Sequence, residues 1–396
     1  MSQSPSQKNI AVVTTGRADY GILSPLLARL QTHSRFNLQL IATGGHLAND
    51  QGYTLELVQA DYPSIHTVAI SPSDDSANGV CHAVGEGLKS FSDLYNQLKP
   101  DLLIVLGDRY ELWAACVAAS LHTLPIAHIH GGELTLGVQD DTIRHCVTKM
   151  SSVHFPATQL YGQRIVQMGE SPERVFPVGA MGIEVIRTTS LMNKEELKQH
   201  SGVDFSQKVA LITYHPVTLD APHKAQQQIE ALLQAAIDSD LTLLITASNT
   251  DIAGRVIQRV IDGFQQRYPA QIVCVKSLGQ KGYLSALKLA SLVLGNSSSG
   301  IIESPSFGTP TINIGERQKG RTQASNTLNC ECTYEAIRDA ITRATAPSFR
   351  ATLQNLSNPY GDGFTSEKII AMLETLDLDD NESLIKKGFF DVPIPS

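Results

Sequence analysis

A glycine-flanked cluster of three serines is the part of this sequence best suited to binding an anion. It spans Gly295–Glu303 and follows the aliphatic run 292–294, while Ile301 and Ile302 begin the apolar face of an expected helix. Unpaired backbone N–H groups and the positive end of a helix dipole favour a phosphate at such a position. Serine is also a common N-cap, so this segment alone fits a cap and a phosphate site equally well.

A second segment carries an unusual density of side chains that can transfer protons. Between residues 128 and 149 the sequence contains His128, His130, Glu133, Asp140, Asp141, Arg144, His145 and Lys149. This composition favours a carboxylate and imidazole acid–base site. His128 and His130 could share a face at a strand end, but no further ligand at a recognisable spacing completes a metal site, so we expect none. Asp140 and Asp141 could instead cap a helix that begins near Thr142.

Polar residues also follow most of the expected strands, and the carboxyl ends of parallel strands are where open sheets bind ligands. In the first half of the chain these residues are Thr15–Tyr20 with Arg17, Gly44–His46, Gly107–Arg109 with Asp108, and His130–Glu133. In the second half they are His215–Thr218, Asn249–Asp251 and the serine cluster with Ser297 and Ser298. Each could be a helix cap or loop residue on its own, but together they predict that both halves face one cleft.

A basic run follows the last expected strand of the second half. It contains Arg317, Lys319 and Arg321, which we expect to lie beside the serine cluster. Guanidinium groups suit the oxygens of a diphosphate. No GxGxxG motif follows the first strand and no GxxxxGK[ST] loop occurs, so neither NAD nor P-loop ATP chemistry is expected. We therefore predict no cofactor.

Short aliphatic or β-branched runs alternate with helical patterns along the chain, which predicts an α/β fold of parallel sheets. The expected strands of the first half are 10–14, 38–42, 67–70, 102–106, 126–129, 153–155 and 175–178. Those of the second half are 209–213, 241–246, 272–275, 292–294 and 311–314. Intervening segments repeat apolar residues every three or four positions, as crossover helices do. Two Rossmann-like, doubly wound domains facing a central cleft fit this pattern best.

Small residues near 179–188 end the last strand of the first half and predict the domain boundary there. We expect an N-terminal domain at 1–180, a C-terminal domain at 181–365, and a helical segment at 366–396 that could pack back on the N-terminal domain. A chain of 396 residues is long enough for two domains.

Composition limits the function classes. A net charge of −8 argues against binding to nucleic acid or a membrane surface, although a local basic cluster could still hold a small anion. The six cysteines show no metal-type CxxC pair and are expected to be reduced thiols. The N-terminus is polar and no run of about 18 apolar residues occurs, which predicts a cytoplasmic protein.

With these residues assembled, the chain resembles the hydrolysing UDP-N-acetylglucosamine 2-epimerases of sialic acid and related nonulosonic acid biosynthesis. The matching motifs span nearly the whole chain and are Thr15–Tyr20, Gly107–Arg109, Gly131–Glu133, Asp140–Asp141 with Arg144–His145 and Thr148–Lys149, His215–Thr218, Gly295–Glu303, Arg317–Gln318 and Tyr360–Gly363. The resemblance implies a fold like that of the GT-B glycosyltransferases, with UDP held mainly by the C-terminal domain and the sugar facing the N-terminal one. It also implies a homodimer or homotetramer.

The reaction implied by the resemblance needs neither NAD nor metal. UDP is eliminated across C1 and C2 to give a 2-acetamidoglucal, water adds at C1, and a proton returns to C2 on the opposite face. By the same resemblance, Asp108 and Asp140 are the acid–base carboxylates, and His215 is the donor to the leaving oxygen. The residues expected to bind UDP or substrate are Arg17, Arg109, Arg144, Asn249, Ser297, Ser298, Glu303 and Arg317.

One position departs from the family pattern. The N-acetylglucosamine-specific members read His-Ile-Glu-Gly-Gly-Glu where this chain has His128–Glu133, so His130 occupies a carboxylate position. His130 could itself act as the base, since neutral imidazole suits physiological pH, or Glu133 could take that role. A histidine here resembles the branch acting on UDP-2,4-diacetamido-2,4,6-trideoxyglucose (UDP-N,N'-diacetylbacillosamine), the legionaminic acid precursor.

We expect that sugar nucleotide or UDP-N-acetylglucosamine as the substrate. A GT-B glycosyltransferase and a non-catalytic sugar-nucleotide sensor are the alternatives. The dense acid–base segment argues against the transferase, and a sensor would have no use for Asp108, Asp140 and His215 together.

Overall fold

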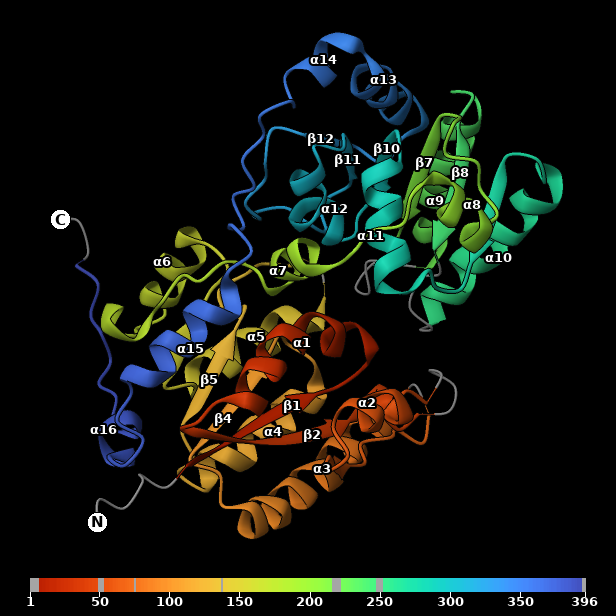
Figure 1. Ribbon diagram of the computed structural model, residues 1–396. Helices are drawn as coiled ribbons and strands as arrows, with labels where there is room; N and C mark the ends of the chain where they lie inside the picture. The colour runs from red at the N-terminus through yellow and green to blue at the C-terminus, as the bar shows by residue number, and fades with distance from the viewer. Residues whose placement is uncertain are drawn as a thin grey trace. The chain divides into compact units, whose positions relative to one another are not determined.

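The computed structural model describes residues 7–48, 53–74, 76–136, 138–215, 222–246 and 252–393 of the chain. The chain forms two compact units (Figure 1). Unit 1 comprises Met1–Glu133, Asp140–Val185 and Gly361–Ser396, and unit 2 comprises Leu134–Gln139 and Ile186–Tyr360. The end of the chain therefore folds with unit 1. A short segment between Glu133 and Asp140, in the middle of the predicted acid–base region, belongs to unit 2.

Unit 1 is built on a six-stranded sheet with the order β3-β2-β1-β4-β5-β6, in which every pairing is parallel. Its strands are β1 Lys8–Thr14, β2 Phe36–Thr43, β3 His66–Val68, β4 Leu102–Leu106, β5 Ile126–Ile129 and β6 Val153–Phe155. This is the strand order of a Rossmann fold, and the chain direction across the sheet reverses between β1 and β4. The loops after β1 and β4 contain the predicted Arg17 and Asp108.

Unit 2 repeats this architecture with the order β12-β11-β10-β7-β8-β9, again with parallel pairings. Its strands are β7 Val209–Thr213, β8 Thr242–Thr246, β9 Ile272–Val275, β10 Leu292–Gly295, β11 Thr311–Ile314 and β12 Thr327–Cys330. The central pair is β10 and β7, and the loops that follow them carry the serine cluster and His215. The predicted α/β class with two doubly wound sheets is confirmed.

Two strand predictions differ from the structure. Residues 175–178 were expected to form a strand, but only Val175 makes an isolated bridge, to His154. Pro177 has no N–H and interrupts the ladder there. Conversely, β12 was not predicted, because Thr327–Cys330 is a partly exposed edge strand without an aliphatic run. Both differences lie at the outer part of a sheet, away from the central strands that lead into the predicted site residues.

Helices cover the sheets. In unit 1 they are α1 Arg17–Thr32, α2 Leu55–Asp61, α3 Ala77–Leu98, α4 Tyr110–Leu121, α5 Gln139–Met150, α6 Gln159–Gln167, α7 Met181–Thr188, α15 Thr365–Thr375 and α16 Asn381–Ile385, with short 3₁₀ turns η1 Gly44–His46 and η3 Pro172–Arg174. In unit 2 they are α8 Lys194–Ser201, α9 Pro222–Ile237, α10 Ile252–Arg267, α11 Gly279–Leu289, α12 Ser299–Ile302, α13 Tyr334–Thr345 and α14 Pro347–Ala351, with η4 Ser304–Phe307. Within the described ranges, no helix has the length and apolar character needed to cross a membrane.

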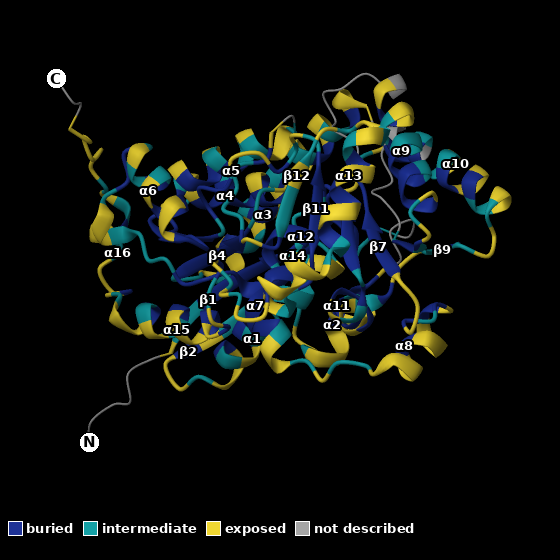
Figure 2. Cartoon of the chain, turned by 90° about the horizontal axis from the view of Figure 1, so that it is seen from above, coloured by how far each residue is buried: buried dark blue, intermediate teal, exposed yellow. Residues whose placement is uncertain are grey.

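Each face of the unit 1 sheet is covered by its own apolar core, which explains why its strands are apolar throughout (Figure 2). Ile10 and Val12 of β1 face the core beneath α1 and α15, while Ala11 and Val13 face the core beneath α3 and α4. This alternation follows from the two-residue period of a strand. Because both faces are filled with apolar side chains, polar groups are left to the strand ends.

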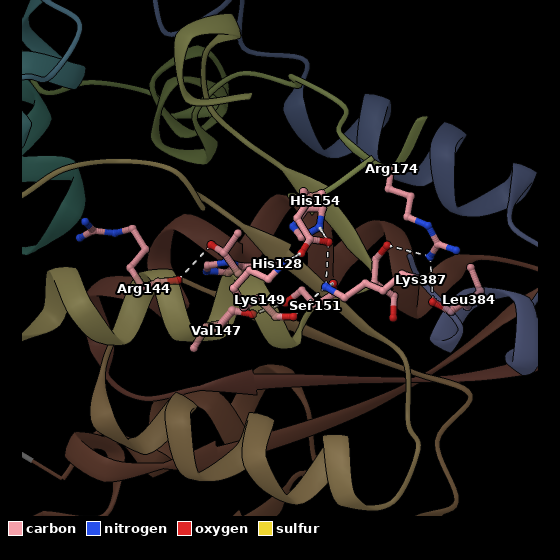
Figure 3. A network of polar contacts seen from close by, with 12 residues as sticks. His128, Arg144, Val147, Lys149, Ser151, His154, Arg174, Leu384 and Lys387 are labelled. Carbon is pink, nitrogen blue, oxygen red and sulfur yellow. Dashed lines mark hydrogen bonds and ion pairs between the residues drawn. The ribbon is translucent and has the colours of Figure 1, made fainter. Parts of the chain in front are cut away.

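The C-terminal segment is attached to unit 1 by a buried polar network around Glu170 (Figure 3). The Glu170 carboxylate, 1% exposed, accepts hydrogen bonds from Lys149, from Lys387 at 2.7 Å and from His154 at 3.1 Å. Arg174 donates to the carbonyl oxygen of Leu384 at 2.8 Å. Over the described part of the expected helical segment at 366–396, α15 and α16 are helical, and the residues around Lys387 form neither helix nor strand.

We predict that Glu170→Gln lowers the free energy of unfolding by roughly 3 kcal/mol at neutral pH, a usual cost of removing one partner from a buried ion pair. Burial would raise the pKa of Glu170, but the bonds from His154, Lys149 and Lys387 outweigh it and lower this pKa from 4.5 to about 2. The depressed pKa contributes stability above pH 4.5 that is lost as the pH falls towards 2. The melting temperatures of the parent protein and Glu170→Gln, measured by thermal unfolding, should therefore differ at neutral pH, and the difference should become smaller as the pH falls from 4.5 towards 2.

The control is Glu173→Gln, because Glu173 is an exposed carboxylate of the neighbouring turn η3. It should leave the melting temperature and its pH dependence unchanged. Equal losses in the two variants would contradict the assigned role of the network.

Candidate active site

Asp108 and the buried guanidinium of Arg144 form the centre of the unit 1 site. Asp108 follows β4, and its Oδ2 accepts a hydrogen bond from Nη2 of Arg144. Nη1 of Arg144 donates to Oδ1 of Asp141 at 3.0 Å and to the backbone oxygen of Glu133 at 3.1 Å. The Arg144 side chain is 4% exposed and that of Asp108 is 22% exposed. One cation thus holds a carboxylate that solvent can still reach.

The charge on Arg144 is maintained by its neighbours. Burial would lower its pKa, but the charges of Asp108, Glu133 and Asp141 outweigh burial and raise it. Arg144 also connects two parts of the chain, since Glu133 and Asp141 lie at either end of the segment that packs with unit 2. The guanidinium therefore fixes both ends of that segment.

His130 is held through both ring nitrogens. Its Nε2 accepts a hydrogen bond from the backbone N–H of Met181 at 3.2 Å, at the start of α7. Nε2 is therefore unprotonated, so the neutral ring carries its proton on Nδ1, which lies 3.3 Å from Oε1 of Glu133. The backbone of His130 is left-handed, with φ of +66°, so the loop turns sharply here. In this arrangement His130 caps α7 and contacts Glu133, and its Nε2 is occupied.

Asp140 lies in the first turn of α5 and is exposed, next to the partly buried Asp141. The helix begins at Gln139, three residues before the expected start at Thr142. The two acidic residues are therefore inside the helix rather than preceding it. Asp141 is the one whose carboxylate binds Arg144, at 3.0 Å.

The two other arginines predicted in unit 1 have different surroundings. Arg17 is exposed at the start of α1, and within the described residues no hydrogen bond or ion pair engages its side chain. The loop beneath it is held by Asp19, which accepts from the backbone N–H groups of Thr15 at 2.6 Å and Gly16 at 2.7 Å. Arg109 makes two bonds, of 3.1 and 3.0 Å, to the buried carboxylate of Glu111. Of the two, Arg17 is the more available to a ligand.

In unit 2, Asn296 organises the ends of three strands. Its side-chain amide makes two 2.7 Å hydrogen bonds to the backbone N–H and C=O of His215, after β7. Its backbone oxygen accepts from Nη1 of Arg317 at 3.0 Å and from Nε2 of Gln318 at 2.7 Å, after β11. Asn296 itself follows β10 and is 1% exposed. The predicted residues His215 and Arg317 are therefore brought together by an amide that the sequence analysis did not identify.

The imidazole of His215 is neutral in this environment. Burial, together with the nearby charge of Arg317, lowers its pKa to about 4. Its Nδ1 is buried and has no hydrogen-bond partner among the described residues. A ring nitrogen in this state is costly to leave without a partner, which makes it a candidate for contact with a ligand.

The serine cluster begins a much shorter helix than expected. α12 comprises only Ser299–Ile302 and is followed by the 3₁₀ turn η4, where Pro305 prevents continuation. The helix-dipole argument for an anion is correspondingly weak. The loop amides remain: no acceptor for the backbone N–H of Ser297 or Ser298 is found in the described part of the chain. Glu303 lies half-buried at the end of α12.

The three cations expected beside the serine cluster have separate positions. Arg317 contacts Asn296, immediately before the serines. Lys319 is exposed and pairs with Glu316 at 2.6 Å. Arg321 donates to the carbonyl oxygen of Leu134 at 2.8 Å and to Oγ1 of Thr135 at 3.0 Å. The hydrogen bond of Arg317 lies at this part of the loop, and the three-cation cluster stays a prediction.

Some predictions could not be compared with the structure. Asn249 and residues 216–218 lie outside the described residues. Among the residues that are described, no three His, Cys, Asp or Glu side chains are grouped as metal ligands. Sequence reasoning quoted Gln318 within a motif without giving it a role, and it missed Asn296 and Tyr283, whose hydroxyl contacts Ser299. The position of Asn296, directly after Gly295 at the end of an apolar strand, was the available signal.

With the fold and both sites described, comparison with known proteins identifies the family. A model of the UDP-N-acetylglucosamine 2-epimerase family matches residues 28–374, and the chain belongs to this family. It is 35% identical to the Campylobacter jejuni GDP/UDP-N,N'-diacetylbacillosamine 2-epimerase (hydrolyzing), covering 98% of this chain and 100% of that protein. It is 34% identical to the Legionella pneumophila UDP-N,N'-diacetylbacillosamine 2-epimerase (hydrolyzing), covering 94% and 97% respectively.

Solved structures share the fold. The Neisseria meningitidis UDP-GlcNAc 2-epimerase, determined bound to UDP-GlcNAc, has a TM-score of 0.78 at 19% identity and covers 93% of this chain and 100% of that one. The Methanocaldococcus jannaschii UDP-GlcNAc 2-epimerase has a TM-score of 0.74 at 17% identity, covering 92% and 99% respectively. The expected GT-B-like fold class is thus confirmed.

We predict that Gly295→Ala destabilises unit 2 by about 3 kcal/mol, because φ at this position is +137° and an added Cβ would overlap the carbonyl oxygen of Thr213. The strain falls at the junction of β10 and β7, directly before Asn296. Thermal unfolding measures the loss. Gly263→Ala is the matched control, since a Cβ there meets open space within helix α10, and it should not lower the melting temperature. Equal melting temperatures for both variants would contradict the assigned strain.

Proposed function

We propose that this protein is a hydrolysing 2-epimerase of a UDP-linked N-acetylated amino sugar, releasing UDP and the free 2-epimeric sugar. The observation that carries the proposal is the Asp108 carboxylate, held at the end of β4 by the buried Arg144 and still partly open to solvent. Removing an unactivated C2 proton requires a positioned base of this kind. Relatives named as hydrolysing 2-epimerases, aligned over nearly the whole chain, support the same reaction.

We assign proton transfer at C2 to the two carboxylates Asp108 and Asp140. One removes the proton from C2 as UDP leaves, and the other returns a proton to the opposite face after water has added at C1. We assign positioning roles to His130 and Glu133, since Nε2 of His130 accepts from Met181 and its Nδ1 faces Glu133. A base must have a lone pair directed at the substrate, and this argues against His130 as the C2 base.

We assign the UDP group to the strand-end residues of unit 2. The unpaired amides of Ser297 and Ser298 and the guanidinium of Arg317 suit the diphosphate, and Glu303 suits the ribose hydroxyls. The buried Nδ1 of His215 is the proposed donor to the leaving oxygen. Arg17, Arg109 and Arg144 in unit 1, and Asn249, complete the proposed binding residues. A transition state in which negative charge builds on the leaving diphosphate is stabilised by such donors.

We propose UDP-N,N'-diacetylbacillosamine as the preferred substrate, with UDP-N-acetylglucosamine as the second candidate. His130, in place of the glutamate of N-acetylglucosamine-specific members, and the substrates after which the Campylobacter and Legionella relatives are named support this order. A homodimer or homotetramer and a cytoplasmic location are further parts of the proposal, and light scattering would measure the assembly mass.

The test is to incubate the protein in deuterated water with each of the two UDP-sugars and to follow UDP release and label at C2. The proposal requires free sugar with the inverted C2 configuration and deuterium at C2. Release without label would indicate simple hydrolysis, and transfer to an added acceptor would indicate a glycosyltransferase. Binding without turnover of either donor would indicate a sensor. Each of these outcomes contradicts the proposal.

Asp108→Asn should lower kcat for the same reaction by about 10²–10⁴-fold, the usual contribution of a positioned acid–base group. UDP affinity, measured by calorimetry, should remain within about twofold of the parent, because the proposed UDP contacts are mainly in unit 2. Asp93→Asn, on an exposed part of α3, is the control and should leave kcat unchanged. A near-normal rate in Asp108→Asn would remove this carboxylate from the mechanism.

We further predict that binding of a UDP-sugar is coupled to proton uptake at His215. The pKa of the free imidazole is lowered to about 4 by burial and by Arg317, and a bound diphosphate would raise it. Affinity should therefore increase as the pH falls from 7 towards 5. Calorimetry with UDP-glucose in two buffers of different ionisation enthalpy measures the protons taken up. His215→Asn should abolish the uptake and His66→Asn should preserve it; uptake that survives in His215→Asn would contradict the assignment.

A further inference from the structure

His128 is a buried histidine of β5 that none of the proposed catalytic steps uses. It is 0% exposed, and its strand neighbours Ala127 and Ile129 are equally buried. Nε2 lies 2.8 Å from the carbonyl oxygen of Gly107, and Nδ1 lies 3.2 Å from Oγ1 of Thr148. Gly107 is the residue directly before Asp108. A buried polar ring with a partner on each nitrogen is a specific connector between these two elements.

These contacts determine which nitrogen carries the proton. Burial lowers the pKa of His128 to about 3, so the ring is neutral and has one donor and one acceptor. A carbonyl oxygen can only accept, so Nε2 carries the proton and donates to Gly107. Nδ1 is then unprotonated and lies 3.2 Å from Oγ1 of Thr148, whose single proton is donated to the backbone oxygen of Arg144. The ring is therefore fixed as the Nε2–H tautomer.

The Gly107 peptide is held from both sides by β5. Its N–H donates to the carbonyl oxygen of Ile129 at 3.1 Å, and its C=O accepts from the side chain of His128. Gly107 has φ of +89°, a conformation that the local sequence does not otherwise restrict. The N–H lies in the peptide plane that precedes Gly107 and the C=O in the plane that leads into Asp108, so the two bonds hold the planes on both sides of the Gly107 Cα. The bond from His128 is the one that fixes the plane leading into Asp108 and, with it, the direction of the Asp108 side chain.

The contacts form a closed ring around Asp108. The hydroxyl of Thr148, on α5, donates to the backbone oxygen of Arg144 at 3.0 Å, one turn earlier in the same helix. The side chain of Arg144 then returns to the Asp108 carboxylate. His128 thus reaches Asp108 by two routes, through the Gly107 peptide and through Thr148 and Arg144.

We propose that His128 is a positioning residue for the reaction, which fixes the Asp108 carboxylate through the Gly107 peptide without contacting the substrate. Only the expected effect on kcat rests on the proposed function. The hydrogen bond by which His128 holds the Gly107 peptide does not depend on it. Small displacements of a reacting group lower the rate with little effect on binding elsewhere, so loss of His128 reduces kcat and leaves UDP affinity intact.

The chain provides a matched control in His154. It is the register partner of His128 on the adjacent strand β6, it is also 0% exposed, and burial lowers its pKa as well. Its Nε2, however, contacts Glu170 in the network that attaches the C-terminal segment. The two histidines therefore share their burial and strand environment and differ in what they hold.

The experiment compares His128→Gln and His128→Asn with His154→Gln and His154→Asn. A glutamine amide reaches the position of Nε2 and still donates to Gly107, whereas asparagine reaches only the position of Nδ1. We expect His128→Asn to lower kcat by about 10–100-fold. His128→Gln should retain kcat within about fivefold, with KM and UDP affinity in both within about twofold. The His154 variants should lower the melting temperature and keep kcat.

Equal losses of kcat in the two His128 variants would overturn the proposal. A loss of kcat in the His154 variants that runs parallel to their loss of thermal stability would overturn it as well. If the His128 variants fail to fold, Thr148→Val replaces them, with Thr148→Ser as the variant that restores the hydroxyl. Lower kcat in Thr148→Val and recovery in Thr148→Ser support the proposal, and unchanged kcat in both contradicts it.

Two measurements do not depend on turnover. Ring ¹⁵N resonances of His128 should show a protonated Nε2 and an unprotonated Nδ1 from pH 5 to 8, and the reverse pattern would overturn the assignment. Amide hydrogen exchange of the segment around Gly107 should be faster in His128→Asn than in His128→Gln. If the protein turns over no UDP-sugar, the proposed function fails, while these two measurements still decide whether His128 holds the Gly107 peptide.

Discussion

The structure of unit 1 around its candidate site depends on neutralising one buried cation. The guanidinium of Arg144 is almost fully buried, and an unpaired charge in that environment would cost several kcal/mol. Its partners Asp108, Asp141 and the backbone of Glu133 are therefore structural requirements as well as site components. Because Asp141 and Glu133 lie at the two ends of the Leu134–Gln139 segment, the same cation also fixes where this segment leaves unit 1 and where it returns. Arg321 also holds the Leu134–Gln139 segment, by hydrogen bonds to the carbonyl oxygen of Leu134 and to Oγ1 of Thr135.

Unit 2 organises its strand ends differently, with a neutral amide in the central position. The side chain of Asn296 binds the backbone of His215 as a second peptide group would, and its own carbonyl accepts from Arg317 and Gln318. Hydrogen bonds between neutral groups add no negative charge beside the serine loop. The end of the central strand β4 in unit 1 thus carries the carboxylate of Asp108, whereas the central strand end of unit 2 carries the amide of Asn296 with the guanidinium of Arg317 beside it. This contrast matches the two tasks assigned to them, proton transfer and retention of an anionic leaving group.

The sequence predicted most of the fold because buried parallel strands are uninterrupted aliphatic runs, and because the polar residue after each run marks its carboxyl end. Asp108, His215 and the serine cluster were found in this way. Predictions failed where the determining contact is distant or local stereochemistry intervenes. Pro305 reduced the expected helix after the serines to one turn, and Pro177 interrupted a strand. The engagement of both nitrogens of His130 could not be predicted, since one partner, Met181, is 51 residues away. Asn296 was missed because a single buried asparagine produces no repeating pattern in the sequence by which it could be recognised.

Burial has a common effect on the histidines of this chain. The pKa of His128 is lowered to about 3 and that of His215 to about 4, and those of His46 and His154 are also lowered by burial. A neutral imidazole in a fixed tautomer provides one donor and one acceptor, so it connects specific groups without adding charge. The charges at the strand ends then come from arginine and carboxylate side chains. The buried Nδ1 atoms of His154 and His215 both have no hydrogen-bond partner in the described structure, and at His215 an anion bound beside Arg317 would favour the protonated form. Proton uptake on binding of a UDP-sugar is therefore assigned to His215, whose pKa is lowered in the free protein by burial and by the charge of Arg317.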